Sequence, residues 1–120
     1  GGADVVSLIN TLTGMKIDIN RRKFMLANKT GGVSGPAIHP IAVRMVYQAF
    51  HAVKVPIIGM GGIASAEDAI EMILAGASAV SVGTANFHNP SVTMEIVDGI
   101  QDYMKQYGFT SVNEMVGLVD

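Results

Sequence analysis

The sequence contains no cysteine and no tryptophan among its 120 residues. The absence of thiols excludes disulfide bonds, thiolate metal sites and a catalytic cysteine within this chain. Apolar stretches are interrupted well short of the roughly 20 residues that a membrane-spanning helix needs, so we expect no segment to cross a membrane. A cysteine-free chain is compatible with the cytoplasm, which is the location that we expect.

Charge is also sparse, because only 15% of the residues are charged and the formal net charge is -2. Neither sign forms a long run, so nothing in the sequence attracts nucleic acid or an anionic membrane. Hydrophobic residues make up 49% of the chain, which predicts a core-forming domain. The first four residues lack the basic segment of a signal peptide and lead at once into an apolar run. We therefore expect the chain to begin in the middle of a domain.

Three short β-rich runs alternate with helical patterns, and they lie at residues 5–9, 56–60 and 79–82. Helices are predicted from Pro40, from Ser65 with Asp68 in the capping-box position, and from Pro90 to about Gly108. A short final helix is expected after Ser111. Alternation of buried strands and helices predicts a parallel sheet.

The second and third runs are separated by a tight glycine loop and one short helix, which is the compact spacing of a (β/α)8 barrel. Such a barrel needs about 250 residues, so three strands make half of one or less. The predicted fold class is α/β, the C-terminal part of a (β/α)8 TIM barrel with about its last three β/α units. Residues 1–120 are expected to form this portion of a single domain whose N-terminal portion is absent.

Residues 10–35 form a polar, glycine-rich connection that is longer than most loops of compact domains. Segments of that length are often functional or contain strands of their own. We predict a two-stranded flap, with strands at 16–19 and 24–27 around the exposed basic turn 21–23.

Glycine loops follow the second and third predicted strands. Gly61-Gly62 leads from the second strand toward the Ser65 helix, and Gly83-Thr84 follows the third strand. Glycine lets the backbone approach a ligand closely with its N–H groups directed at it, and a helix N-terminus adds a positive dipole end. Loops after consecutive final strands are typical of the phosphate site of (β/α)8 barrels. The alternative is that these glycines only turn the chain, as a third loop at 31–37 could also do.

Other polar residues carry weaker signals. Asn10-Thr11 ends the first predicted strand, where barrel enzymes place site residues, although a turn role is equally compatible. His39, His51 and His88 lack ligand-like spacing, so each is predicted to be exposed or to cap a helix. No carboxylate pair stands at catalytic spacing.

Four segments together resemble dihydroorotate dehydrogenase of class 1, type B. They are Asn10-Thr11-Leu12, residues 31–37, residues 57–63 and Val82-Gly83-Thr84-Ala85. The similarity runs over essentially the whole chain. The resemblance implies an FMN-containing barrel that oxidises dihydroorotate to orotate in pyrimidine synthesis. It also implies a homodimer whose electrons pass to a second subunit with FAD and an iron–sulfur cluster, and from there to NAD.

The resemblance assigns roles to eight residues. The FMN phosphate would be held by the backbone N–H groups of Gly61, Gly62, Gly83 and Thr84. The flavin would be contacted by Ile9 and Gly35. The pyrimidine substrate would be bound by Asn10 and Thr11 at the end of the first strand. The catalytic base, a cysteine in this type, is expected upstream, so no catalytic residue is predicted in this chain.

Two other readings remain open at this point. One is another phosphate-binding barrel, either a histidine-pathway isomerase or a different FMN oxidoreductase. The other is a non-catalytic half-barrel that only associates to cover its open edges. Bound flavin would absorb blue light, whereas an isomerase would be colourless. Sedimentation with and without FMN would test the non-catalytic half-barrel.

Overall fold

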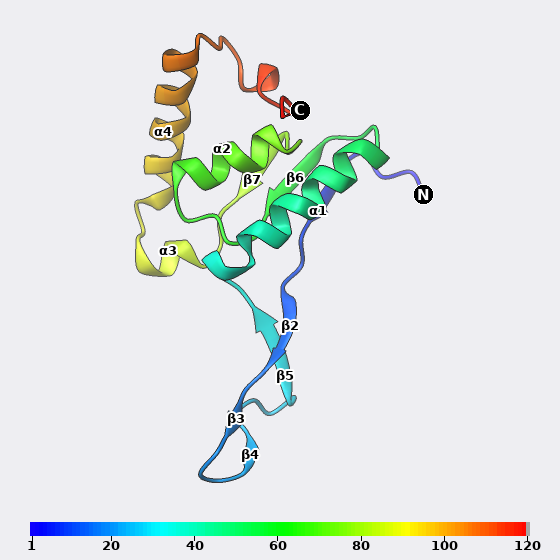
Figure 1. The fold of residues 1–120 in the computed structure, drawn as a ribbon, viewed down its shortest axis with the longest axis vertical. Helices are drawn as coiled ribbons and strands as arrows, with labels where there is room; N and C mark the ends of the chain where they lie inside the picture. Colours follow the sequence, from blue (N-terminus) through cyan, green and yellow to red (C-terminus); the bar gives the residue numbers. More distant parts are fainter. Residues whose placement is uncertain (120) are drawn as a thin grey trace.

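The computed structural model describes residues 1–119, and its centre is a three-stranded parallel sheet (Figure 1). The strands are β1 (Val6–Leu8), β6 (Ile57–Met60) and β7 (Ala79–Ser81), in the order β1-β6-β7. Both pairings are parallel. The three predicted β-rich runs are thus confirmed as strands, each trimmed at its ends, and the parallel arrangement is confirmed with them.

Helices α1 (His39–Ala52) and α2 (Ala66–Leu74) connect these strands and lie together on one face of the sheet (Figure 1). Their apolar sides meet the central strand, where Val46 of α1, Met72 of α2 and Ile57 of β6 are almost wholly buried. The opposite face carries the register row Ser7, Ile58 and Ala79. Within residues 1–119 no helix covers that face, which parallel sheets normally bury.

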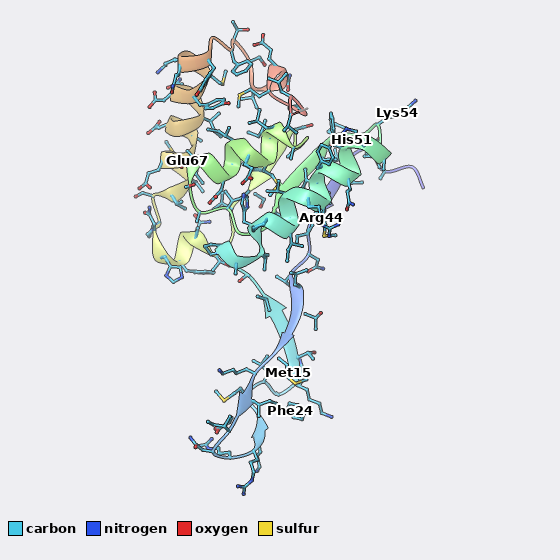
Figure 2. All side chains as sticks on the ribbon, in the orientation of Figure 1. Met15, Phe24, Arg44, His51, Lys54 and Glu67 are labelled. Atoms are coloured by element: carbon cyan, nitrogen blue, oxygen red, sulfur yellow. The ribbon has the colours of Figure 1, made fainter. Side chains whose placement is uncertain are left out.

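Residues 12–33 form an arm that projects away from the sheet and helices (Figure 1). Strand β2 (Leu12–Met15) pairs antiparallel with β5 (Thr30–Val33), and β3 (Ile17–Asp18) pairs with β4 (Lys23–Phe24). The predicted flap exists but is shorter than expected, and the β2–β5 ladder beneath it was not predicted. Its strands contain three glycines, and glycine has a low β-strand propensity, so the residue types do not indicate a strand there. Met15 and Phe24 stand exposed on this arm (Figure 2).

The remaining helices complete the chain. They are the 3-10 turn η1 (Pro36–Ile38), α3 (Ala85–His88), α4 (Val92–Tyr107) and the 3-10 turn η2 (Val112–Glu114). Helix α4 starts two residues after Pro90 and ends at Gly108, whose left-handed φ of 77° suits glycine. It packs against α2, and Met115 closes a second apolar cluster there. No helix in the described part of the chain is both long and apolar enough to cross a membrane.

Candidate ligand site at the carboxyl edge of the sheet

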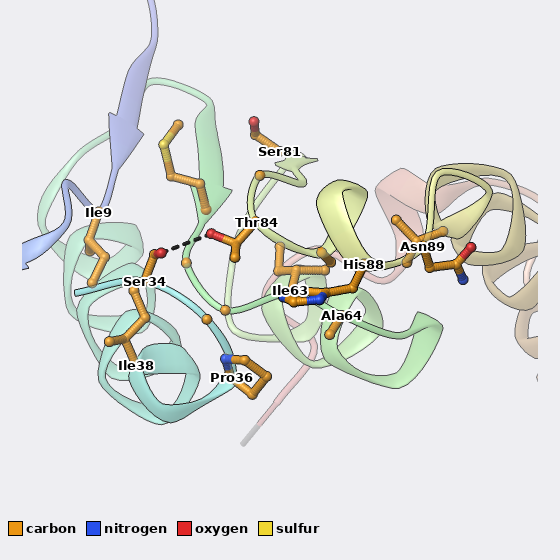
Figure 3. Close-up of a pocket in the computed structure, with 17 residues that line it drawn as sticks. Ile9, Ser34, Pro36, Ile38, Ile63, Ala64, Ser81, Thr84, His88 and Asn89 are labelled. Atoms are coloured by element: carbon orange, nitrogen blue, oxygen red, sulfur yellow. Dashed lines mark hydrogen bonds between the residues drawn. The ribbon is translucent and has the colours of Figure 1, made fainter. Parts of the chain in front are cut away.

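A cavity of about 480 Å³ opens at the carboxyl ends of the three parallel strands (Figure 3). Ligand pockets of enzymes usually enclose about 300–1,000 Å³, so this volume suits a small molecule. All six residues predicted to contact a cofactor line it: Ile9, Gly35, Gly61, Gly62, Gly83 and Thr84. They come from four separate segments of the chain, and only the fold brings them together. Their role in holding a cofactor stays a prediction.

The backbone of two of these segments takes conformations that only glycine adopts readily. Gly35 has a φ of 97°, Gly61 of 131° and Gly62 of 69°. The two segments also touch, because a Cβ built on Gly62 would lie 2.7 Å from the Gly35 carbonyl oxygen and 2.8 Å from the backbone nitrogen of His39. Gly62 is therefore required by the packing of the chain itself as well as by any ligand.

Gly83 differs from Gly62 in both respects. Its φ lies outside the left-handed region, and a Cβ built on it would meet no atom within 4 Å. The fold of residues 1–119 thus gives no packing reason for glycine at this position, although Gly83 lines the cavity. Open space beside a cavity-lining backbone is what a bound group would need.

Unpaired donors gather around this cavity. Within residues 1–119, the backbone N–H groups of Gly62, Gly83 and Thr84 donate to no backbone or side-chain acceptor. Backbone N–H groups that converge on a concave site favour an anion, and a phosphate group offers several acceptor oxygens to them. This donor set fits the phosphate group of a nucleotide cofactor such as FMN.

The start of α2 makes a smaller contribution than the sequence suggested. The Asp68 carboxylate accepts hydrogen bonds from the backbone N–H groups of Ala64 at 2.9 Å and Ser65 at 3.1 Å, while the Ser65 hydroxyl accepts one from Asp68 N–H at 3.2 Å. This confirms the predicted capping box. It also occupies three N–H groups that a ligand could otherwise have used, so the start of α2 offers fewer donors to a ligand than an uncapped helix would.

Side chains hold the loop after β7 in place. The Asn86 amide donates to the carbonyl oxygens of Val82 at 2.8 Å and Gly83 at 3.1 Å. The Thr84 hydroxyl donates to the Ser34 hydroxyl at 2.9 Å, which joins this loop to the segment before η1 (Figure 3). The donors at Gly83 and Thr84 are therefore kept in position before any ligand arrives.

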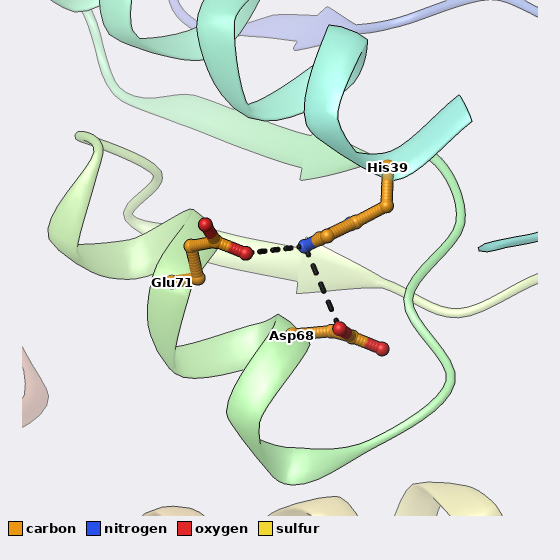
Figure 4. Close-up of side chains that lie close together, drawn as sticks. All are labelled: His39, Asp68 and Glu71. Carbon is orange, nitrogen blue, oxygen red and sulfur yellow. Dashed lines mark hydrogen bonds and ion pairs between the residues drawn. The ribbon is translucent and has the colours of Figure 1, made fainter. Parts of the chain in front are cut away.

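His39 was predicted to be exposed or to cap a helix, and this prediction is wrong. Its side chain is only 7% exposed, with Nδ1 2.9 Å from the Gly61 carbonyl oxygen and Nε2 3.1 Å from Glu71 Oε2 (Figure 4). Asp68 Oδ1 lies 3.8 Å from the same Nε2. No pattern in the sequence could predict this contact, because Glu71 lies 32 residues away and α1 and α2 meet only in the fold. The ring thus links α1, the glycine loop and α2.

The predicted substrate residues lie at the edge of this region. Asn10 and Thr11 directly follow Ile9, whose N–H donates to Met60 O at 2.9 Å, but both are exposed and neither lines the cavity. Asn10 Oδ1 accepts the Thr11 N–H at 2.8 Å, as in a turn. This arrangement does not test whether Asn10 and Thr11 contact the substrate, so that contact stays a prediction.

Among the described lining residues of the cavity, His88 is the one side chain with an ionisable group. The carboxyl group with a clearly shifted pKa is Glu114 in η2, where hydrogen bonds from Thr110 lower the pKa below 4.5, and this group does not line the cavity. The expectation that the catalytic base lies outside this chain stays a prediction.

Comparison with known proteins places these features in a family. A family model described as "Dihydroorotate dehydrogenase" matches residues 1–104. Two relatives, from Lachnoclostridium phytofermentans and Alkaliphilus oremlandii, are each 64% identical to this chain over 99% and 98% of its length. A third, from Parabacteroides distasonis, is 55% identical over 99%. All three carry the name "Dihydroorotate dehydrogenase B (NAD(+)), catalytic subunit".

This chain spans about 40% of the length of these relatives, with 40%, 39% and 39% of their residues covered. Among solved structures, a crystal structure of DHODH in complex with ferulenol from Eimeria tenella superimposes with a TM-score of 0.79 at 30% identity. That match covers 98% of this chain and 31% of the other. The parallel sheet and its helices are thus part of a (β/α)8 barrel, as predicted.

Proposed function

Because this chain belongs to the dihydroorotate dehydrogenase family, we propose that it forms the C-terminal part of an FMN-binding barrel that oxidises dihydroorotate to orotate. The observation that carries the proposal is the convergence of three glycine segments, around Gly35, Gly61-Gly62 and Gly83, on one cavity. The family match favours this flavoenzyme over the histidine-pathway isomerase and over a half-barrel with no catalytic role.

In this proposal the phosphate of FMN receives hydrogen bonds from the N–H groups of Gly61, Gly62, Gly83 and Thr84, which have no other partner within residues 1–119. The bound FMN would supply the two-electron acceptor for the oxidation. Ile9 offers an apolar surface to the flavin, since its side chain is buried at the cavity wall. Gly35 lets the neighbouring backbone approach the same ring without a side chain between.

Asn10 and Thr11 are proposed to bind the pyrimidine ring of dihydroorotate. The Asn10 side chain is exposed and lies just beyond the carboxyl end of β1, where the ring would stand if the flavin rests on Ile9. An amide offers both donors and an acceptor, which match the N–H and C=O groups of the ring. The base that takes the substrate proton would come from the rest of the barrel.

The whole enzyme is proposed to act in pyrimidine biosynthesis in the cytoplasm as a homodimer. The relatives' name contains "catalytic subunit" and "NAD(+)", which supports a second subunit and NAD as the electron acceptor. We propose that this second subunit carries FAD and an iron–sulfur cluster. The open edges of β1 and β7 are where the remaining strands of the barrel would pair.

The test uses a chimeric subunit, in which this chain replaces the matching 119 residues of the Lachnoclostridium phytofermentans relative. We expect the purified chimera to contain FMN and to form orotate with an artificial electron acceptor. Riboflavin, which lacks the phosphate, should bind at least about 100-fold more weakly, because two or three charge-assisted hydrogen bonds are lost. Equal affinity for FMN and riboflavin would refute the phosphate site, and a colourless chimera would refute the flavoenzyme.

A further inference from the structure

The buried ring of His39 faces hydrogen-bond acceptors with both of its nitrogens. Nδ1 lies 2.9 Å from the carbonyl oxygen of Gly61, and a carbonyl oxygen can only accept. Nε2 lies 3.1 Å from Glu71 Oε2 and 3.8 Å from Asp68 Oδ1, and ionised carboxylates also only accept. A neutral imidazole has one N–H, so it could satisfy one of these contacts and would direct a lone pair at the other acceptor.

We propose that His39 is a doubly protonated positioning residue, which clamps the Gly61-Gly62 loop to helix α2 so that the loop is ready to bind a phosphate. The proposal deepens the proposed function and rests on it. The charge of the imidazolium is balanced locally, because both titratable groups that face it, Asp68 and Glu71, are carboxylates on α2. The glycine loop contributes only its carbonyl oxygen.

The clamp acts through the geometry of one peptide group. In a trans peptide the C=O and N–H bonds point in opposite directions, so holding the Gly61 oxygen against His39 directs the Gly62 N–H away from α1. Gly62 is one of the cavity-lining residues whose N–H has no acceptor within residues 1–119. With both glycines in left-handed conformations, this peptide would otherwise rotate easily. His39 thus reduces the conformational freedom that phosphate binding would have to remove.

The same three side chains could in principle hold a metal ion, since one ligand atom of each lies within 4.8 Å of the others. The structure favours a proton over a metal at this place. Asp68 already accepts two backbone hydrogen bonds in the capping box, and the 3.1 Å contact between Nε2 and Glu71 is a hydrogen-bond distance. A metal ion would need the lone pair of Nε2, whereas the clamp needs a proton there.

Substitutions at His39 in the chimeric subunit separate a donor from a space-filling role. Lysine has three donors and a positive charge, so His39→Lys should keep FMN affinity within about threefold of the unsubstituted chimera. Glutamine also has N–H donors, but it carries no positive charge to balance Asp68 and Glu71 and adds an acceptor oxygen beside them, so His39→Gln should lower FMN affinity by roughly tenfold or more. The matched controls are His51→Lys and His51→Gln, because His51 is exposed on the same helix and its one hydrogen bond within residues 1–119 is to the Tyr47 carbonyl oxygen. Neither control should alter FMN affinity.

Nitrogen NMR of the histidine rings in the chimera reports the protonation state directly and needs no ligand. Both nitrogens of His39 should carry a proton at pH 7, and addition of EDTA should change neither the spectrum nor FMN affinity. A singly protonated ring, a loss of FMN on chelation, or tighter FMN binding by His39→Gln than by His39→Lys would each overturn the clamp while leaving the FMN site standing. Failure of the unsubstituted chimera to bind FMN would overturn the proposed function, and the clamp with it.

Discussion

Substitution of Gly83 by valine offers the cleanest way to remove the proposed phosphate site without disturbing the fold. Gly83 lines the cavity, has an ordinary φ, and would place a new Cβ more than 4 Å from every atom beyond its two chain neighbours. The Cβ of a substituted valine would therefore meet no other part of the protein. It would instead occupy space that the proposal assigns to the phosphate group.

The expected loss follows from the donors that the phosphate could no longer reach. Gly83 and Thr84 each offer one unpaired N–H, and a hydrogen bond to a charged group contributes about 1.5–3 kcal/mol. Losing both corresponds to about 3–6 kcal/mol, or roughly a 10²- to 10⁴-fold rise in the Kd for FMN. Stability without ligand should be equal or slightly higher, because replacing glycine restricts the unfolded chain.

The assay compares flavin content per subunit, FMN affinity and thermal unfolding of the apoprotein for chimeras with Gly83→Ala, Gly83→Val and Gly62→Val. Alanine should have a smaller effect than valine at the same position. Gly62→Val should lose flavin and also destabilise the apoprotein, since its Cβ would meet backbone atoms at 2.7 and 2.8 Å. Stoichiometric FMN in purified Gly83→Val protein would refute the reasoning, as would an equal loss of apoprotein stability in the Gly83 and Gly62 variants.

Three further outcomes are expected. Asn10→Ala in the chimera should raise the KM for dihydroorotate about ten- to a hundredfold and leave FMN content unchanged, because it removes one well-formed hydrogen bond to the substrate; an unchanged catalytic efficiency in a steady-state assay would contradict this. Residues 1–120 prepared alone should form no orotate above background with FMN and an artificial acceptor, because proton abstraction needs a positioned base; turnover of about 1 per second or faster would show otherwise. Hydrogen bonds from Thr110 lower the pKa of Glu114 below 4.5, so their stabilisation of η2 should be present above pH 4.5 and lost as the pH falls through the lowered pKa. In an NMR titration, Thr110→Val should raise the pKa of Glu114 toward 4.5, and an unchanged value would contradict the assigned cause.

Much of the fold could be predicted because it depends on local patterns. The apolar runs of β6 and β7 contain no charged side chain, as strands buried in a parallel sheet require. Ser65 and Asp68 predicted the start of α2 through a motif only four residues long. By contrast, the β2–β5 ladder joins segments separated by 14 residues, from Lys16 to Lys29, and neither strand has a strong pattern of its own.

Part of the candidate site could also be predicted from the sequence. The glycine loops after β6 and β7 could be recognised because barrel topology places the carboxyl ends of neighbouring parallel strands at one edge. The environment of His39 could not. No spacing rule connects a histidine at the start of one helix with Glu71 in the next, and burial of the ring depends on how α1 and α2 pack.

The sequence by itself thus determined the three parallel strands and the helices between and after them, and where the chain must bend in ways open only to glycine. Those properties are set by side-chain periodicity and by backbone sterics within a few residues. Only the tertiary structure decided which glycine is free to change and which is not, because a Cβ at Gly62 would meet Gly35 and His39, whereas a Cβ at Gly83 would enter open space. It alone placed His39 between a carbonyl oxygen and two carboxylates, since distances between elements arise from packing and not from order along the chain.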